Sequence, residues 1–393
     1  MPWEEKTVEE TRAEFIARAM SGEQSKSALC REYGISRPTA YKWIERYLNG
    51  ENLSDHSRRP FHSPQRIDPI IEAAIIQMRR MYPALGAKKI HRMMLNDGIF
   101  VPPAVSTINA VLKRNGLICR EASLAATPYK RFEKEQPNQM WQADFKGNFT
   151  MQNGQQCHPL SILDDHSRMC LCADAKANQQ RSGVQESFQK TFETYGLPSI
   201  LLCDNGHPWG ASQSTSITKF EVWLMQLGIL PIHIRIKHPQ TQGKVERFNG
   251  SYKRECLKFY TPVDLADAQR TRQEYMHFYN HRRPHEALSM DVPAEHYTPS
   301  TRNFPSKISS WEYEAGGSIR SIKSSGYLTI DGQGYYLSEG LGDQTVMIYP
   351  SASREHTVDV VFRQFRVAQI DVLEHVVISR RIRLLHDDPR FQL

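Results

Sequence analysis

Three acidic residues stand at positions where their carboxylates could gather on divalent metal ions. Asp144 ends an expected strand in MWQADF, and Asp204 directly follows the short apolar segment SILLC, in CDNG. Glu246 lies in an expected helix, QGKVERFNGSYKRECLKFY, on the side opposite its apolar residues. Hard cations such as Mg²⁺ take oxygen ligands and keep several waters, which leaves room for substrate phosphates. Two such ions about 3.5–4 Å apart can activate the attacking oxygen of a phosphoryl transfer and stabilise the leaving oxygen.

Each of these acids also has an ordinary explanation when it is considered alone. Asp-Asn-Gly is a common turn, and an Asp in a strand or a Glu in a helix is usually just solvated. Asp164 and Asp165 could be mistaken for the second acid of the group. Their place in a turn with Ser167 and Arg168 favours capping or hairpin formation instead.

The elements expected around the acids form a mixed sheet flanked by helices, over residues 138–300. In MWQADF, Trp141 and Phe145 alternate with Gln142 and Asp144, which is the period of a half-buried strand. Further strands and helices then alternate along the chain, which is typical of an α/β domain. In order they are two strands around DDHSR, a helix ending at Tyr195, the strand SILLC, the helix TKFEVWLMQLG, the strand PIHIRIK and two helices.

Residues 1–52 are predicted to form a helix-turn-helix unit. Gly34 suits the left-handed turn after one helix, and Ser36 can cap the next, with Pro38 in its first turn. Four residues share the apolar face of this second helix and are expected in the core: Ala40, Trp43, Ile44 and Tyr47. Such a helix enters the DNA major groove. The residues expected to face DNA are Arg37, Thr39, Lys42 and Arg46. The alternative is a helical bundle with a solvated polar face.

The other segments have distinct patterns. Residues 64–118 resemble a second helix-turn-helix unit, whose last helix begins at Ser106 or Thr107, and residues 119–137 are an expected linker. Residues 308–375 contain short alternating strands and a hairpin turn at Asp331-Gly332, which predict a small all-β barrel or sandwich. Residues 376–393 are an expected basic tail.

Composition supports a globular protein and leaves its partner open. Hydrophobic residues make up 39% of the 393 residues, and the net charge of +7 lies mostly in the amino-terminal third. A basic segment suits DNA, although a merely basic surface explains the charge equally well.

Seven cysteines without a CxxC pair argue against a disulfide framework and a four-ligand zinc site; Cys170 and Cys172 alternate onto one strand face as expected core residues. No apolar run approaches the roughly 20 residues that span a bilayer, so we expect a soluble intracellular protein.

The motifs WQADF, CDNG and HPQTQGKVERFNG together resemble the catalytic core of insertion-sequence transposases and retroviral-type integrases. YNHRRPHEALSMDVPAEHY is similar to the segment that closes this core, CREYGISRPTAYKWIERY to the family's helix-turn-helix, and GYLTIDGQGYYLSEGL to its small barrel. The resemblance implies a ribonuclease-H-like core with a mixed five-stranded sheet and a small SH3-like barrel. It also implies that Asp144, Asp204 and Glu246 are the catalytic, metal-binding acids and hold two Mg²⁺ or Mn²⁺ ions.

The sequence departs from the family pattern in two places. The interval from Asp204 to Glu246 is longer than usual, and we expect the extra residues in the loop PWGASQSTSITK. The His/Cys zinc motif of retroviral integrases is missing near the amino terminus. Near Glu246, a lysine two turns further along the helix and two neighbours are candidate DNA contacts, although a surface lysine is a serious alternative. These candidates are Gln242, Asn249 and Lys253.

The predicted function is that of a DNA transposase or integrase. Water attacks a phosphodiester at an element end and frees a 3′-hydroxyl, which then attacks a target strand in the same pocket. The expected partners are double-stranded DNA and further copies of the chain, which would form a dimer or tetramer. We expect the protein in the bacterial cytoplasm, associated with the nucleoid and not with a membrane. The alternatives are an inactive helix-turn-helix regulator, which has no use for three acids, and a nuclease for RNA–DNA hybrids, which needs no sequence-specific arm.

Overall fold

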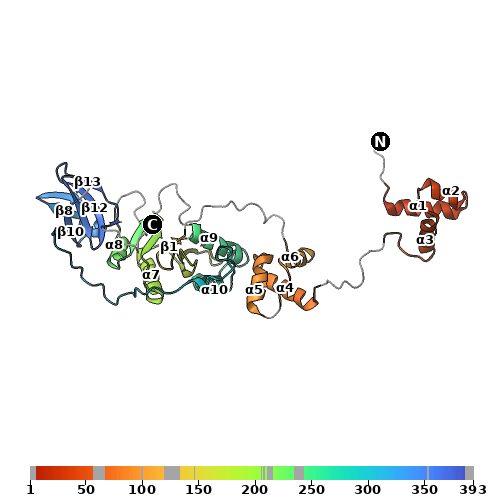
Figure 1. Ribbon diagram of the computed structural model, residues 1–393, viewed down its shortest axis with the longest axis horizontal. Coiled ribbons are helices and arrows are strands. Elements are labelled where there is room, and N and C mark those ends of the chain that lie inside the picture. The colour runs from red at the N-terminus through yellow and green to blue at the C-terminus, as the bar shows by residue number, and fades with distance from the viewer. Residues whose placement is uncertain are drawn as a thin grey trace. The chain divides into compact units, whose positions relative to one another are not determined.

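The computed structural model describes residues 6–55, 67–98, 101–118, 133–145, 147–204, 206, 209, 216–233, 243–351 and 354–385. The chain forms two compact units, residues 1–66 and residues 67–393 (Figure 1). Across these described ranges, no helix combines the length and the apolar character needed to cross a membrane.

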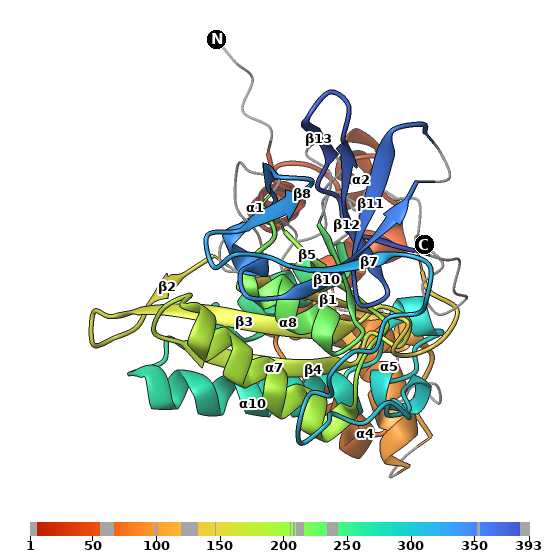
Figure 2. The same cartoon turned by 90° about the vertical axis from the view of Figure 1, so that its left-hand side faces the viewer.

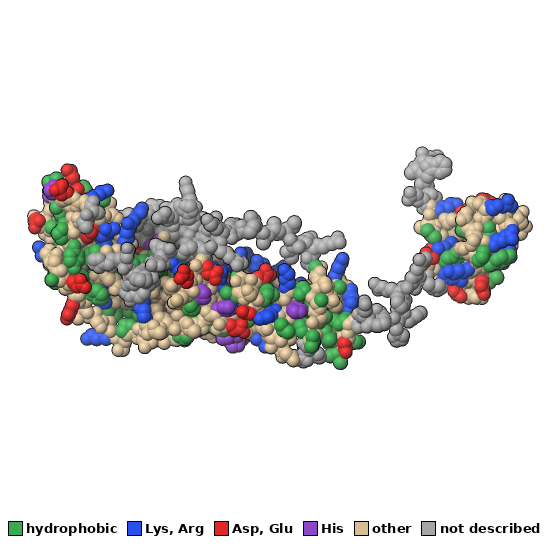
Figure 3. Space-filling view, in the orientation of Figure 1, with side chains coloured by type: hydrophobic (Ala, Val, Ile, Leu, Met, Phe, Trp, Pro, Cys, Tyr) green, Lys and Arg blue, Asp and Glu red, His purple; other side chains and the backbone are tan. Residues whose placement is uncertain are grey.

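The first unit is a bundle of three helices, as expected. Thr7 begins the first helix with a capping box, and the Ser25 and Ser36 side chains cap the second and third. Gly34 lies between these last two helices with a φ of 66°, a backbone conformation that glycine adopts without strain. Lys and Arg side chains dot the visible surface of the unit (Figure 3). The helices are α1 (Val8–Ser21), α2 (Lys26–Glu32) and α3 (Arg37–Leu48).

Two residues of α3 lie on the side opposite to the expected one. Tyr47, expected in the core, is 53% exposed, whereas Arg46, expected to face DNA, is 7% exposed. The guanidinium of Arg46 lies 4.8 Å from the ring centre of Trp43, donates to Asn52 O at 2.7 Å and pairs with Glu51 at 3.3 Å. The chain after α3 folds back over this side chain, so Arg46 belongs to the core of the unit.

Three further helices form a second small core. Ile75, Ile90 and Ile108 are fully buried in it. The last helix begins at Val105, before the expected Ser106 or Thr107, and follows Pro102 and Pro103. The helices are α4 (Pro69–Met81), α5 (Ala87–Asp97) and α6 (Val105–Arg114).

This helical group contacts the α/β core that follows it. Tyr82 stacks on Phe278 with ring centres 4.7 Å apart. Arg92 pairs with Asp291 at 2.6 Å, and Arg282 pairs with Asp97 at 2.9 Å. The second group of helices is therefore held against the core by one aromatic stack and two ion pairs.

The α/β core contains the expected mixed sheet. Its strand order is β2-β3-β1-β5-β6, with β4 paired to the other side of β3. β1 is antiparallel to β3 and parallel to β5. The strands are β1 (Met140–Phe145), β2 (Phe149–Thr150), β3 (Gln156–Asp164), β4 (Cys170–Lys176), β5 (Ile200–Cys203) and β6 (Leu230–His233).

Helices cover both faces of this sheet. Side chains of α7 and α8 pack with Trp141 and Ala143, and those of α9 and α10 pack against the other face; Figure 2 shows α7 and α10 running beside β4. β1 is therefore buried on both faces, and even Gln142 is 1% exposed, where the sequence predicted a half-buried strand. The helices are α7 (Arg181–Tyr195), α8 (Lys219–Gln226), α9 (Gly243–Tyr252), the π-helical turn Lys253–Leu257, α10 (Leu265–His281) and the short 3₁₀ helices Glu286–Leu288 and Pro293–His296.

Cys170 and Cys172 are buried, but not on one face of β4. Cys172 pairs with Ile162 and Cys170 pairs with the next residue of β3, Leu163. One extra residue of β4 therefore lies between the two pairs. This β-bulge changes the alternation. Cys170 then packs with the residues of α9 and α10, and Cys172 with those of α7.

The carboxyl-terminal region is all β. Asp331 and Gly332 form the predicted hairpin turn, and both have positive φ, 48° and 83°. The strands β13 and β14, which lie in the expected tail, both pair with β12, so the sheet continues past residue 375. The elements are β7 (Ser318–Ser321), β8 (Tyr327–Ile330), β9 (Gln333–Tyr336), the 3₁₀ helix Glu339–Leu341, β10 (Thr345–Pro350), β11 (Thr357–Phe362), β12 (Phe365–Asp371), β13 (Val376–Ser379) and β14 (Arg383–Leu384).

This β region shares one hydrophobic cluster with the α/β core. Leu202, Val222 and Leu230 of the core pack in it together with Leu341 and Phe365 of the β region. Two buried polar contacts join the same surfaces: Arg363 donates to Gln226 O at 2.7 Å, and Ser338 donates to Ile217 O. The β region and the α/β core therefore share a common hydrophobic core.

Candidate active site

Two of the predicted acids lie at the ends of neighbouring parallel strands. β1 and β5 pair in register, with Met140 opposite Ile200 and Gln142 opposite Leu202. Continued by two residues, this register places Asp144 beside Asp204, and neighbouring strands lie about 4.8 Å apart. Asp204 Oδ1 accepts a hydrogen bond from Gly206 N at 3.0 Å.

The third acid is on the helix that packs across β1 and β3. In α9, Val245, Phe248 and Tyr252 are buried against the sheet, and Glu246 is exposed. Burial and then the negative charge of Asp204 raise the pKa of Asp144 from 3.8 to about 6, and the charge of Glu246 acts in the same direction. The structure therefore brings all three carboxylates within electrostatic reach of one another.

Asn249 holds Asp144 from the helix side. Its Nδ2 donates to Asp144 Oδ2 at 3.0 Å, and its Oδ1 accepts from Ser161 Oγ at 2.8 Å. Arg272 in turn donates to Ser161 Oγ at 2.9 Å. Because Ser161 occupies the amide oxygen, the amide nitrogen is left for the carboxylate. Asn249 is 4% exposed and buried beneath the helix, so it binds an acid of the site, where the sequence predicted a DNA contact.

His233 holds the chain at Asp204. Its Nδ1 lies 2.8 Å from Asp204 O, and its Nε2 lies 2.9 Å from Glu221 Oε1. Burial lowers the pKa of His233, but the hydrogen bond and the charge of Glu221 outweigh it, so the pKa is raised. A protonated imidazole donates from both ring nitrogens, which suits these two acceptors. Sequence reasoning missed this role, for which the place of His233 at the end of β6 is the one available signal.

The three carboxylates have the donor chemistry of a divalent-metal site. Within the described part of the chain, neither Lys nor Arg forms an ion pair with Asp144, Asp204 or Glu246. Burial is the largest cause of the raised pKa of Asp144, and the negative charges of Asp204 and Glu246 add to it; a bound cation would relieve this repulsion. As the side chains stand, no three metal-ligating groups among the described residues are close enough to enclose an ion. The residues fit Mg²⁺ or Mn²⁺ by type and charge, and closure of the site requires side-chain movement.

The remaining predicted residues lie as follows. Lys253 is exposed and begins the π-helical turn after α9, and Arg37 and Lys42 are exposed on α3, where Thr39 is partly buried. Gln242 and most of the loop PWGASQSTSITK lie outside the described residues. Asp164 ends β3 and Asp165 begins the turn that follows it, and both accept hydrogen bonds from backbone and side-chain donors.

Family comparisons identify the segment that contains these residues. The Integrase core domain family matches residues 134–239 and, through a second model of the same description, residues 227–293. The chain contains an integrase core domain. A Helix-turn-helix domain family matches residues 11–61, and a Homeodomain-like domain family matches residues 39–112. The predicted resemblance is thus confirmed, and the integrase core follows two groups of DNA-binding type helices.

Relatives of this integrase-core chain are proteins of mobile elements. It is 23% identical to the Insertion element IS407 uncharacterized 31.7 kDa protein of Burkholderia multivorans, over 69% of this chain and 90% of that protein. It is 25% identical to the Transposase InsD for insertion element IS2A/D/F/H/I/K of Escherichia coli, over 54% of this chain and 66% of that protein. The matched families and these relatives support a transposase or integrase with DNA-binding helix-turn-helix units.

One solved structure of similar topology is the HTLV-2 integrase catalytic core domain in complex with magnesium. It is 18% identical, with a TM-score of 0.31, and covers 42% of this chain and 99% of that chain. Because this TM-score is low, the fold assignment follows from the strand order and the family matches instead.

Proposed function

We propose that this protein cuts DNA at the ends of a mobile element and joins the freed ends to target DNA. The observation that carries the proposal is the register that sets Asp144 beside Asp204 at two strand ends, with Glu246 on the helix packed across β1. Burial, and then the negative charges of Asp204 and Glu246, raise the pKa of Asp144. Three acids at two strand ends and one helix, without ion-pair partners in the described chain, are suited to divalent cations.

Asp144, Asp204 and Glu246 would hold two Mg²⁺ or Mn²⁺ ions. When bound, the ions supply charge neutralisation at the transferred phosphoryl group and at the attacking and leaving oxygens. Asn249 favours the ionised form of Asp144 by donating to it, and His233 fixes the backbone at Asp204. The protein therefore contributes placement and charge rather than covalent chemistry.

The proposed reaction has two balanced steps. In the first, a water oxygen bonds to phosphorus at the element end, the P–O3′ bond breaks, and the 3′-oxygen leaves as a hydroxyl. In the second, this 3′-hydroxyl oxygen bonds to a target phosphorus, and the target 3′-oxygen leaves with a proton. The first step is a hydrolysis that leaves a 5′-phosphate and a 3′-hydroxyl, and the second exchanges one phosphodiester for another. Neither step needs an oxidant or a reductant.

DNA contacts would come from the exposed basic side chains. Arg37, Thr39 and Lys42 on α3 would face the DNA major groove, and Lys253 would hold a phosphate; the exposure of Arg37, Lys42 and Lys253 supports this. Because two element ends must be joined together, a dimer or tetramer on DNA is the assembly expected in the bacterial cytoplasm.

A strand-transfer assay on labelled DNA that carries the element's own ends tests this function. Wild type is expected to give joined products that require Mg²⁺ or Mn²⁺, and Glu246→Gln is expected to reduce them at least about 100-fold. Glu274→Gln, an exposed acid of α10 outside the site, is the matched control and should retain activity. Tight end binding by wild type without cleavage under either metal would overturn the proposal and leave a DNA-binding regulator.

A further inference from the structure

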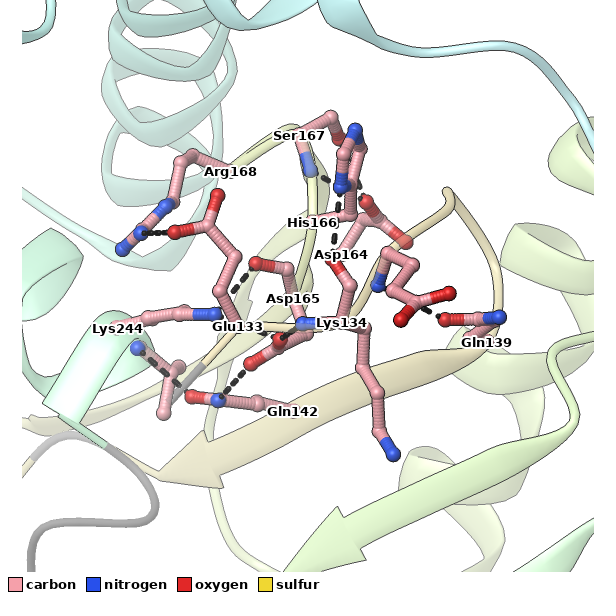
Figure 4. A network of polar contacts seen from close by, with 12 residues as sticks. Glu133, Lys134, Gln139, Gln142, Asp164, Asp165, His166, Ser167, Arg168 and Lys244 are labelled. Carbon is pink, nitrogen blue, oxygen red and sulfur yellow. Dashed lines mark hydrogen bonds and ion pairs between the residues drawn. The ribbon is translucent and has the colours of Figure 1, made fainter. Parts of the chain in front are cut away.

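A buried ion pair joins the helix that carries Glu246 to the turn after β3. Lys244 Nζ lies 2.6 Å from Asp165 Oδ2 and also donates to Asp165 O at 2.7 Å. The Asp165 side chain is fully buried, and the Lys244 side chain is 9% exposed. Figure 4 shows Lys244 and Gln142 gathered around Asp165. Such a pair tolerates little displacement, because either charge left alone in this environment is costly.

Asp165 also sets the orientation of the Gln142 side-chain amide. Asp165 Oδ1 accepts from Gln142 Nε2 at 2.7 Å, while Oδ2 accepts from Lys134 N at 2.8 Å. An ionised carboxylate can only accept, so it selects the amide nitrogen of Gln142 and leaves Oε1 for another donor. That donor is Val245 N at 3.3 Å. Gln142 thereby satisfies one of the backbone N–H groups that the first turn of a helix leaves unpaired.

These contacts lie beside two of the three acids. Gln142 is two residues before Asp144 on β1, and residues two apart share a face of a strand. Val245 directly precedes Glu246. Sliding of α9 along β1 by even part of a turn would break the Lys244–Asp165 pair and the Gln142–Val245 bond together.

We propose that Asp165, acting through Lys244 and Gln142, is a positioning residue that fixes the distance between Asp144 and Glu246. The inference rests on the proposed metal-dependent function of those acids. Asp165 itself does not reach the reacting atoms, since its oxygens are occupied by Lys134, Gln142 and Lys244.

The adjacent Asp164 supplies a matched control. It is as buried as Asp165, and it accepts from Asn138 N at 2.7 Å and from Ser167 N and Oγ at 2.8 and 2.7 Å. These partners lie in the turn and ahead of β1, not in α9. Asp164→Asn should therefore lower thermal stability much as Asp165→Asn does, without moving Glu246.

The experiment compares full-length wild type, Asp165→Asn and Asp164→Asn. Manganese binding is measured by electron paramagnetic resonance of free Mn²⁺, and strand joining is measured at saturating Mg²⁺ with DNA ends varied. Asp165→Asn is expected to weaken Mn²⁺ binding about 10-fold or more and to lower kcat, with KM for the DNA ends unchanged. Asp164→Asn is expected to stay within about twofold of wild type in Mn²⁺ binding, because its hydrogen bonds do not orient the metal-binding acids.

Variants of Lys244 complete the test. Lys244→Arg, which can keep the ion pair, should bind Mn²⁺ better than Lys244→Met. The double variant Asp165→Asn/Lys244→Met should bind Mn²⁺ no more weakly than the worse single variant, because both remove the same link. If the wild type binds Mn²⁺ and joins DNA, equal Mn²⁺ binding by Asp165→Asn and Asp164→Asn would overturn the positioning role of Asp165 and leave the proposed function standing. A wild type that neither binds Mn²⁺ nor joins DNA would overturn the proposed function and this inference with it.

Discussion

Asn249 Nδ2 donates to Asp144 Oδ2 across 3.0 Å and links α9 to β1. The bond counters the burial and the like charges that raise the pKa of Asp144. The helix that carries one acid of the proposed site therefore also helps to keep another acid ionised.

Removal of the amide should weaken metal binding most at low pH. In Asn249→Ala, Asp144 loses the donor that favours its carboxylate, so its pKa should rise further above 6. A hydrogen bond to a charged group is worth about 1.5–3 kcal/mol, which corresponds to a tenfold or greater effect. Mn²⁺ titrations near pH 6 and near pH 8 should show the larger loss at the lower pH. The exposed Asn153→Ala serves as control, and an equal loss at both pH values would contradict this role.

Ionisation of Asp144 should destabilise the metal-free protein. Its pKa is about 6 in the folded chain against an ordinary 3.8. The stability gained from the protonated form is fully present below about pH 3.8 and is lost as the pH rises through about 6. At about 1.4 kcal/mol per pKa unit, the cost above that pH is roughly 3 kcal/mol. Asp144→Asn should therefore unfold at a higher temperature than wild type near pH 7.5 in a chelator, and the difference should shrink towards pH 4.5. A difference independent of pH would refute the assignment.

Arg46 should act through the stability of the first helical unit. Arg46→Ala removes the hydrogen bond to Asn52 O and the contact with the Trp43 ring, at a cost of about 1–3 kcal/mol. Lys42→Ala removes an exposed charge, so its free energy of unfolding should stay within about 0.5 kcal/mol of wild type. The same variant should bind DNA more weakly and with a smaller salt dependence. Hydrogen exchange of residues 6–55 and DNA titrations at two salt concentrations separate the effects. Reduced DNA binding by Arg46→Ala with unchanged exchange would show a direct contact instead.

Gly340 should be essential for seating the β region on the core. A side-chain carbon at this position would overlap the backbone at Ile217 and Thr218. Gly340→Ala is therefore expected to lower the unfolding temperature through a loss of about 2 kcal/mol or more, since backbone atoms cannot move aside cheaply. Gly334→Ala, where the added carbon meets only the Tyr327 ring at an ordinary 3.7 Å, is the control. Equal unfolding temperatures of the two variants would argue against tight packing here.

Most of the elements, and the three candidate acids, could be predicted from the sequence alone. Local rules placed the Ser36 cap, the Gly34 turn and the Asp331-Gly332 hairpin, because each depends on the conformational preference of one or two residues. The motifs around Asp144, Asp204 and Glu246 predicted a shared site, which stays a prediction; the β1–β5 register and the packing of α9 support it.

The tertiary structure decided which polar residues face inward. Arg46, Asn249 and Lys244 are polar residues on helices, and the polarity of such side chains favours the surface. Each side chain is buried because a partner from another segment binds it. The β-bulge that separates Cys170 from Cys172, and the shared core of the α/β and β regions, likewise depend on pairing between distant segments. A pattern along one helix or strand records its own periodicity, whereas hydrogen bonds and packing between segments are fixed only when the chain brings them together.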